Sequence, residues 1–450
     1  RELAKALDVS RFTVIKSYEE LISQGYFQTD LGTGTFVSRR LPLAEQARLE
    51  IVDRDPASSI SRNAKTFLRT QSVEAADAEL FPELNYGAPA MEQLPLVQWK
   101  QILAKHSRNK ESSDFEYESD PAGYLPLREA LCAYLKRSRF VSCNAEQVFI
   151  FSSAQSALDL ISTIFLNQGD LAAVEDPGFP GARRSFLAHG AELLPVAVDG
   201  DGLCVNLLKE RPELKLLYTT PSRQDPTAVV LSADRRKELL EWASRSRAMI
   251  IEDDFDNEYR YGGALVPSLQ SMDKNQSVLY LSSFWKTMFP LVRLGFLVVP
   301  PAFVNVFRAA KAMLDRDNRA IEQVVLCDFI NEGLLEKHIQ KTRKLYSSRR
   351  QALIYALTKG FGKSISIAKE SSGMNLICRF RKDFSLEQIM KAAEDASAPL
   401  VSTSSFYANK KAVNEFLIAF AHLSEEQIAI SIKSFASRLN QEQSPSWHED

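Results

Sequence analysis

The sequence lacks the features that mark several large classes of protein. Its 450 residues include only five cysteines and five histidines, scattered without the CxxC spacing of a metal site or the density of a disulfide scaffold. No apolar run is long enough to cross a bilayer, and no segment has the pattern of a signal peptide. The formal net charge is only −2, so overall charge indicates neither a nucleic-acid nor a membrane partner. These absences favour a reduced, cytoplasmic setting without metal or membrane, and any DNA-binding surface must be local.

The first 38 residues have the pattern of a compact unit. "RELAKALDV" predicts a helix, and Ser10 is placed to cap a second helix over "RFTVIKSYEELISQGY", which Gly25 ends. "YFQTDLGTGTFVS" then alternates as a hairpin does, with a Gly-Thr-Gly tip. Helix, turn, helix and hairpin together predict a winged helix-turn-helix over residues 1–38.

The remaining chain predicts an α/β body behind a linker. Residues 39–80 are irregular and rich in serine and charge, as in a partly flexible linker. From residue 81 to 440, helical patterns alternate with the short apolar runs "QVFIF", "LAAVED", "LKLLYTT", "AMIIEDD" and "SVLYLSS". This alternation predicts a mostly parallel sheet covered on both faces. The segment from about 345 to 440 predicts a small C-terminal α+β subdomain.

Polar residues follow three of the predicted strands, where open parallel sheets bind ligands. The helix that begins at Ser153, Ala154 and Gln155 offers free amides that suit a phosphate. Asp253 ends a second strand, and Ser283 and Lys286 follow a third. Arg293, seven residues after Lys286, adds a bidentate cation.

These residues are the parts needed to hold a phosphorylated aldehyde. A buried lysine is held neutral and can form an imine, so Lys286 is the predicted attachment point. Asp253 would pair with a protonated pyridine nitrogen, while Ser283, Arg293 and the helix start would hold the phosphate. Pyridoxal 5′-phosphate meets all three requirements. Each signal alone has an ordinary alternative: a surface lysine, a solvated acidic loop, a simple helix cap.

The chain resembles the MocR-type subfamily of GntR regulators, in which a winged helix-turn-helix is fused to a fold type I aminotransferase-like domain. "DPAGYLPLREALCAYL", "EDPGFPGARRSF", "TPSRQDPT", "IEDDFDNEYRY" and "SSFWKTMFPLVRLGFLVVP" are among the segments that carry the resemblance. It implies that Lys286 binds the cofactor, that Asp253 contacts the ring nitrogen and that Arg293 contacts the phosphate. It also implies that Phe179 stacks on the ring, and that Tyr124 reaches the phosphate of a neighbouring subunit, so that the site depends on a homodimer.

The sequence also departs from the pattern of that family. Phe255 stands where a tyrosine hydroxyl usually bonds the cofactor's 3′-oxygen. His422 stands where an arginine usually grips a substrate carboxylate, so we expect it to face the effector. Further departures near the predicted site are Ser153, Trp285, Arg223, Asp225 and Ala228. The pocket is therefore expected to have diverged towards an unusual effector or weak cofactor binding.

The second helix of the N-terminal unit is the predicted DNA reader, since that helix lies in the major groove in this motif. Its outward-facing start and the tip of the wing supply the candidate contacts to phosphates, bases and the minor groove: Ser10, Arg11, Thr13, Lys16, Thr33 and Gly34. The sequence begins at Arg1 without methionine. Because the resemblance places a further helix before this point, we expect the DNA-binding head to be N-terminally truncated.

The leading hypothesis is a pyridoxal-phosphate-dependent transcriptional regulator that binds double-stranded DNA as a homodimer. An amine or amino-acid effector, or the cofactor itself, would be sensed through imine chemistry at Lys286 and coupled to the DNA heads. The alternative is a working class I/II aminotransferase with a vestigial DNA-binding head. Phe255 and His422 favour the regulator, with at most residual transamination. A third hypothesis is a regulator that has lost its cofactor.

Overall fold

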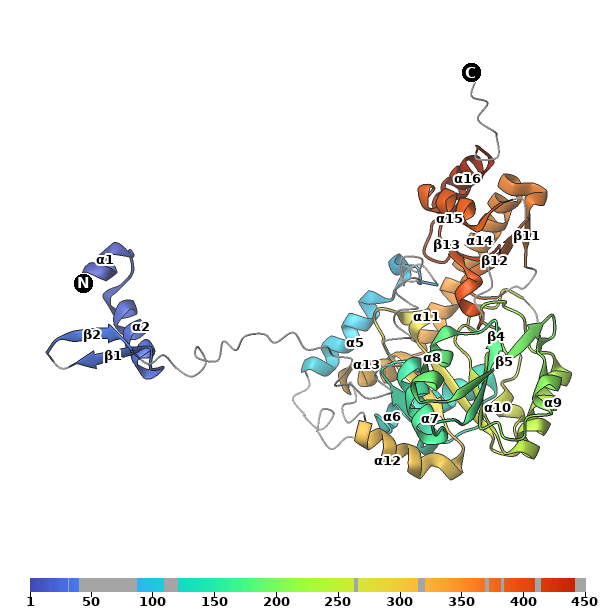
Figure 1. Cartoon of the computed structure of the whole chain (residues 1–450), viewed down its shortest axis with the longest axis horizontal. Helices are drawn as coiled ribbons and strands as arrows, with labels where there is room; N and C mark the ends of the chain where they lie inside the picture. Colours follow the sequence, from blue (N-terminus) through green and yellow to red (C-terminus); the bar gives the residue numbers. More distant parts are fainter. Residues whose placement is uncertain are drawn as a thin grey trace, which may run out of the picture. The chain divides into compact units, whose positions relative to one another are not determined.

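The computed structural model describes residues 1–30, 32–39, 87–108, 120–262, 266–314, 320–368, 372–381, 384–408 and 414–441 (Figure 1). The chain divides into two compact units, Arg1–Ser61 and Arg62–Asp450. Each unit is described by itself. The linker predicted over residues 39–80 lies outside the described residues, apart from Arg39.

The N-terminal unit has the two helices and the hairpin that the sequence predicts. Helix α1 (Glu2–Ala6) is followed by α2 (Arg11–Ser23), and strands β1 (Phe27–Asp30) and β2 (Gly34–Val37) pair antiparallel. The Ser10 hydroxyl accepts from the Thr13 backbone N–H at 3.0 Å, which caps α2. Tyr18 packs edge-on against Phe27 and so joins α2 to the hairpin.

The second unit is built on an eight-stranded sheet with the order β3-β10-β9-β8-β7-β4-β5-β6. Strands β9, β8, β7, β4 and β5 are parallel neighbours, and β10 runs antiparallel between β3 and β9. The strands are β3 (Val148–Phe151), β4 (Leu171–Asp176), β5 (Glu192–Asp199), β6 (Gly202–Leu203), β7 (Leu216–Thr219), β8 (Met249–Asp253), β9 (Val278–Ser283) and β10 (Gly295–Val298).

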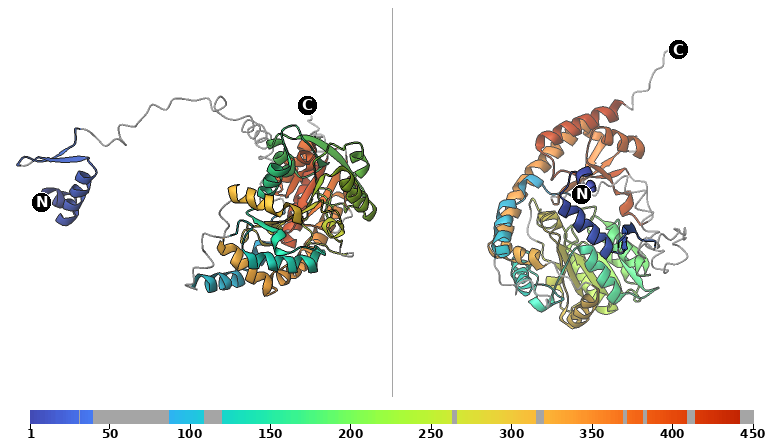
Figure 2. Two further views of the ribbon diagram at one scale, coloured as in Figure 1. Left: turned by 90° about the horizontal axis from the view of Figure 1, so that it is seen from below. Right: turned by 90° about the vertical axis from the view of Figure 1, so that its left-hand side faces the viewer.

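Helices cover both faces of this sheet (Figures 1 and 2), so the central strands β8 and β9 are buried on both sides, as their apolar sequences require. On β9, Leu279 and Leu281 pack with α7 (Ala154–Phe165), α8 (Pro180–Ala188) and α12 (Val304–Leu314). Tyr280 faces the opposite side, which is covered by α5 (Leu96–Arg108), α6 (Leu125–Arg139), α13 (Ala320–Asn331) and, further along the sheet, α9 (Ala233–Ser246). The shorter elements of this part are η2 (Met91–Gln93), η4 (Ala145–Gln147), η5 (Val205–Leu208), α10 (Leu269–Met272), α11 (Trp285–Met288) and η6 (Pro301–Phe303).

A smaller antiparallel sheet, with the order β11-β12-β14-β13, lies near the end of the chain. It packs against α14, α15 and α16 around an aromatic core that contains Phe361, Phe380 and Phe435. The long helix α14 belongs to both parts, because Leu335 packs with the large sheet and Leu353 with the small one. These elements are α14 (Leu334–Phe361), η7 (Gly362–Ser364), β11 (Ile365–Ile367), β12 (Asn375–Phe380), α15 (Leu386–Asp395), β13 (Leu400–Ser402), η8 (Thr403–Phe406), β14 (Glu415–Ala419) and α16 (Glu425–Gln441).

The predicted fold class is confirmed, and all five predicted strands are present as β3, β4, β7, β8 and β9. Three strands of the large sheet were not predicted: β5, which is partly exposed, the two-residue strand β6, and β10, which lies inside the lysine-containing stretch. None of the described helices combines the length and the apolar character needed to cross a membrane.

Candidate cofactor and DNA-binding sites

The carboxyl ends of β3, β4, β7, β8 and β9 lie at the same edge of the large sheet, because β10 runs opposite to both of its neighbours. Lys286 lies at this edge, in the short helix α11 that follows β9, and is only 6% exposed. His338 of α14 donates from Nε2 to the Thr287 carbonyl at 2.9 Å and so connects α14 to α11. Burial lowers the pKa of Lys286, which favours the neutral, nucleophilic amine.

Gly87 leaves the space that the Lys286 amine occupies. A Cβ at this position would lie 2.2 Å from Lys286 Nζ, and the backbone φ of +82° also suits glycine. No pattern in the sequence marked Gly87 as a site residue, since its role depends on two segments that are far apart in the chain.

Asp253 is the last residue of β8 and is buried. Its Oδ2 accepts from the Tyr218 hydroxyl at 2.7 Å, whereas Oδ1 has no hydrogen-bond partner among the described residues. Burial raises the pKa of Asp253 to about 7, opposed by the Tyr218 hydrogen bond. A buried carboxylate oxygen without a partner suits a cationic N–H donor such as a protonated pyridine.

The raised pKa of Asp253 predicts a pH dependence of the cofactor-free protein. The folded state holds this proton more tightly than the unfolded chain, so the Asp253 contribution to stability falls as pH rises from about 4 to about 7. We expect the difference in melting temperature between Asp253→Asn and the wild type to shift in favour of the variant between pH 5 and pH 8. Melting curves of both proteins across that range, without cofactor, test this; a constant difference would contradict it.

The predicted phosphate turn is a helix N-terminus. Ser153 caps α7 by accepting from the Ser156 backbone N–H, so Ala154 and Gln155 supply the first amides of the helix. Gly295 of β10 packs closely here, because a Cβ on it would lie 3.0 Å from the Ala154 backbone nitrogen. Ser283 is the cross-strand partner of Gly295. The structure therefore brings the turn and Ser283 together.

Arg293 begins the same strand region but its side chain is exposed. Its backbone N–H donates to Glu322 of α13. Arg293 is two residues before Gly295, which packs against the predicted phosphate turn.

Aromatic rings line the space between the turn, Asp253 and Lys286. Phe179 is half-buried, and its ring centroid lies 6.1 Å from that of Tyr218. A Cβ on Gly181 would lie 2.4 Å from the Phe179 ring and 2.7 Å from Gln155 Oε1, which places Phe179 beside the phosphate turn. The Phe255 ring centroid lies 5.9 Å from Lys286 Nζ. Tyr218 was not predicted, because a tyrosine inside an apolar strand has no distinguishing pattern.

Charged side chains surround Lys286. Asp256 and Asp225 act to raise the pKa of Lys286, whereas Arg223 acts to lower it along with burial. Arg223 is buried, lies 3.4 Å from Asp256 Oδ2 and donates to Asn375 Oδ1 of β12 at 2.7 Å. Arg223 therefore joins the large sheet to the small one beside the lysine.

The described contacts of two further predicted residues, Tyr124 and His422, are with other groups. Tyr124 precedes α6 and its backbone N–H donates to Gln323 at 2.8 Å. His422 follows β14, and the charged groups that act on its ring are Arg349 and Glu92 rather than the groups around Lys286. Burial lowers the pKa of His422, which keeps the ring neutral. The described contacts thus do not connect His422 with the lysine.

The predicted DNA contacts are all on the surface of the N-terminal unit. Arg11, Thr13 and Lys16 of α2 are exposed, as are Thr33 and Gly34 at the hairpin tip. Ser10 is exposed too, but its hydroxyl is engaged with Thr13 in the helix cap. The cations of α2 therefore remain accessible to a phosphate backbone.

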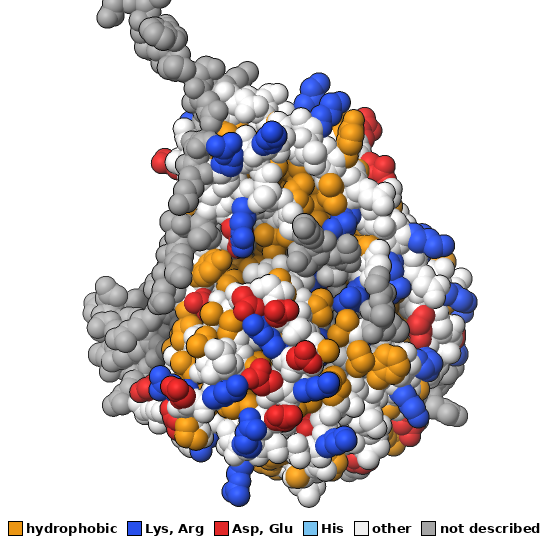
Figure 3. Space-filling view, turned by 90° about the vertical axis from the view of Figure 1, so that its right-hand side faces the viewer, with side chains coloured by type: hydrophobic (Ala, Val, Ile, Leu, Met, Phe, Trp, Pro, Cys, Tyr) orange, Lys and Arg blue, Asp and Glu red, His pale blue; other side chains and the backbone are white. Residues whose placement is uncertain are grey.

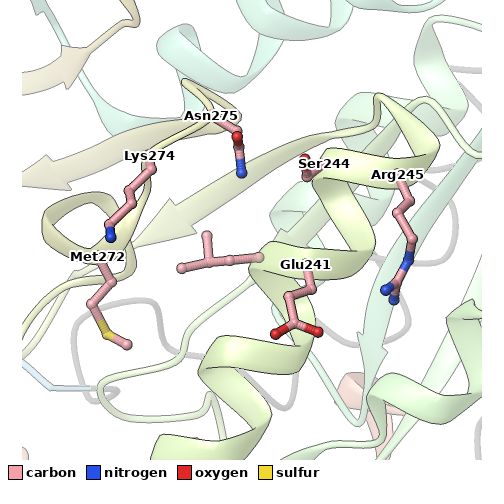
Figure 4. A pocket seen from close by; sticks show the side chains of 7 residues that line it. Glu241, Ser244, Arg245, Met272, Lys274 and Asn275 are labelled. Atoms are coloured by element: carbon pink, nitrogen blue, oxygen red, sulfur yellow. The ribbon is translucent and has the colours of Figure 1, made fainter.

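A separate surface cavity of about 330 Å³ lies between α9 and the connection from α10 to β9 (Figure 4). Its lining includes Arg245, Met272 and Lys274. This cavity is at the amino end of β9, whereas Lys286 follows the carboxyl end of that strand. It takes no part in the cluster around the lysine.

Known proteins share both the fold and the arrangement of the chain. The family "Aminotransferase class I and II" matches residues 83–435. The probable rhizopine catabolism regulatory protein MocR of Rhizobium meliloti is 33% identical over 88% of this chain and 79% of its own length. The chain belongs to the MocR-type regulators, with a class I and II aminotransferase domain.

Two further comparisons differ in how much of this MocR-type chain they cover. The uncharacterized HTH-type transcriptional regulator YhdI of Bacillus subtilis is 30% identical over 96% of this chain and 88% of its own length. The structure of Pyrococcus horikoshii kynurenine aminotransferase in complex with PMP has a TM-score of 0.72 and 29% identity, covering 79% of this chain and 90% of that one. The cofactor of the domain is pyridoxal 5′-phosphate, and the orphaned oxygen of Asp253 and the buried Lys286 suit it.

Proposed function

We propose that this protein regulates transcription by binding double-stranded DNA through residues 1–38 and by sensing a small amine in the aminotransferase-like domain. The main support for this proposal is that a regulator, YhdI, matches 96% of the chain, so the match includes both the N-terminal unit and the aminotransferase-like domain. The aminotransferase structure matches 79% of the chain, a smaller share than the regulator does.

Lys286 would hold the cofactor covalently, and Asp253 would fix the ring nitrogen with Tyr218 holding the carboxylate in place. The amides of Ala154 and Gln155, with Ser283 and Arg293, would bind the phosphate, and Phe179 and Phe255 would line the ring. Bound pyridoxal phosphate supplies an electrophilic carbon and an electron sink for an amine. An effector that exchanges with Lys286 would release the lysine amine into the field of Asp256, Asp225 and Arg223.

Arg223 offers a physical route from this event to the rest of the domain. It contacts Asp256 near the lysine and Asn375 in the small sheet, and all three side chains are buried. A change of charge at Lys286 would alter this buried network. The proposal is that the change moves the small sheet relative to the large one, and that a homodimer, completed by Tyr124 of each subunit, transmits it to two DNA heads.

The aminotransferase alternative is less well supported. Phe255 has no hydroxyl to bond the cofactor. Burial lowers the pKa of His422, and a neutral ring cannot grip a carboxylate as an arginine does. The effector is an amine or an amino acid, and pyridoxal phosphate itself is a further candidate.

The proposed binding of DNA through α2 can be tested directly by a gel shift. On the face of the second unit in Figure 3, positive and negative side chains are interspersed, and such a mixed surface does not attract the negatively charged DNA backbone. We expect full-length protein to shift DNA from the upstream region of its own gene in low salt. Arg11→Ala with Lys16→Ala should reduce the salt slope of binding by about one per removed cation in each head and weaken binding to every sequence.

The matched control removes two exposed cations from α9, Lys237→Ala with Arg245→Ala, and should leave the shift unchanged. The shift is measured with and without pyridoxal phosphate. Equal loss in both double variants, or no shift by the wild type at low salt, would refute DNA binding through α2.

A further inference from the structure

The structure brings together two of the five cysteines that the sequence scatters. Cys143 Sγ lies 3.5 Å from Cys132 Sγ, and both side chains are half-buried. Ten residues separate them in the chain, without the spacing of a redox motif. Cys132 is in the middle of α6, and Cys143 lies in the segment that returns along that helix after it ends at Arg139.

The backbone on both sides of Cys143 is already fixed. Ser142 exchanges two hydrogen bonds with Gln270, at 3.1 and 2.9 Å. The Ala145 carbonyl accepts from Arg128 of α6 at 3.0 Å, four residues before Cys132. A disulfide requires the sulfurs to approach to about 2.05 Å, which is about 1.5 Å closer than their separation here.

The two thiols also differ in their charged surroundings. The contact with Cys143 and the nearby Arg128 lower the pKa of Cys132, whereas the contact with Cys132 and burial raise the pKa of Cys143. Such a difference suits one thiol that reacts first and one that resolves the product. Cys327 and Cys378, by contrast, are buried.

We propose that Cys132 and Cys143 are a modification site for hydroperoxides and form a reversible disulfide within the chain. The Cys132 thiolate attacks hydrogen peroxide: an S–O bond forms, the O–O bond breaks, and the leaving hydroxide takes the proton that Cys132 lost on ionising and departs as water. The Cys143 sulfur then attacks Cys132; the S–S bond forms, the S–O bond breaks, and a second water leaves. Two thiols lose two electrons and two protons, and hydrogen peroxide is reduced to two waters.

The disulfide closes a loop that carries Arg139. This arginine donates to Asp254 Oδ1 at 2.9 Å and to Ser222 at 2.8 Å, and Asp254 is the neighbour of Asp253. Oxidation therefore ties covalently a segment that supports the edge of the sheet where Lys286 lies.

Peptide mapping after oxidation tests the proposal. Full-length protein is treated with hydrogen peroxide, free thiols are alkylated, and the digest is analysed without reduction. We expect a peptide pair that joins Cys132 to Cys143, two fewer alkylated thiols, and recovery of both with dithiothreitol. Retention of both thiols under conditions that oxidise an exposed thiol standard, or links only between separate chains, would overturn the proposal.

Two variants locate the chemistry. Cys143→Ser should leave Cys132 as a sulfenic acid that dimedone labels, because no resolving thiol remains. Cys204→Ser is the control, since Cys204 is half-buried beside Asp199 and distant from the pair in sequence; it should leave the link intact. If Cys143→Ser fails to fold, the wild-type peptide map decides alone. Loss of the link in Cys204→Ser would also overturn the pairing.

Discussion

Lys286→Ala should abolish covalent retention of pyridoxal phosphate. Wild-type protein saturated with cofactor and reduced with borohydride should carry one cofactor per chain, on the peptide that contains residue 286, whereas the variant should show only background. The reason is that Lys286 combines burial, a lowered pKa and a position at the carboxyl edge of the sheet. The measurement is the intact mass, followed by peptide mapping and the visible spectrum.

Lys209→Ala provides the control for this experiment, because Lys209 is an exposed lysine paired with Glu238 on the surface. That variant should retain the cofactor fully. If Lys286→Ala still carried one cofactor after reduction, the assignment of this lysine would be wrong.

The same variant separates the regulator from a protein that has lost its cofactor. If pyridoxal phosphate or an amine changes DNA binding through Lys286, the change should vanish in Lys286→Ala while basal DNA binding persists. Identical spectra and identical DNA binding for wild type and variant, each with added cofactor, would support the third hypothesis, a regulator without cofactor.

The position of the candidate site at the sheet edge could be predicted from the sequence because it depends on strand ends. Apolar runs identify β8 and β9. Asp253 ends β8, Ser283 ends β9, and Lys286 follows three residues later, so each lies at or close to the end of its strand. Parallel order then brings the two ends to one edge. The phosphate turn was predictable for the same reason, since Ser153 lies two residues after the end of β3 and caps α7.

Contacts between distant segments were not predictable. Gly87 faces Lys286, Tyr218 holds Asp253, and Cys132 meets Cys143, yet each pair depends on how separate elements pack. Strand β5 escaped detection because its exposed side weakens the apolar pattern. The position of His422 beside Arg349 likewise follows from the packing of α14 on the small sheet, which no local pattern records.

Asp253→Asn should weaken the binding of pyridoxal phosphate by on the order of 100-fold or more, because it removes the buried carboxylate that would pair with the ring nitrogen. Tyr218→Phe is the matched variant: it removes one hydrogen bond to Asp253 but leaves the charge, so about a tenfold loss is expected. Binding is measured by fluorescence titration at pH 8, where Asp253 with its pKa of about 7 is mostly ionised before the cofactor arrives.

A cofactor analogue with carbon in place of the ring nitrogen isolates that contact. It offers no N–H to Asp253, so wild type and Asp253→Asn should bind it within a few-fold of each other, whereas they should differ strongly for pyridoxal phosphate. Equal loss with both ligands would show that Asp253→Asn acts through the packing of the site, not through the ring nitrogen. The ionised Asp253 carboxylate destabilises the cofactor-free protein but binds the ring nitrogen when the cofactor is present. Asp253→Asn should therefore raise the stability of the cofactor-free protein at pH 8 while lowering its affinity for the cofactor.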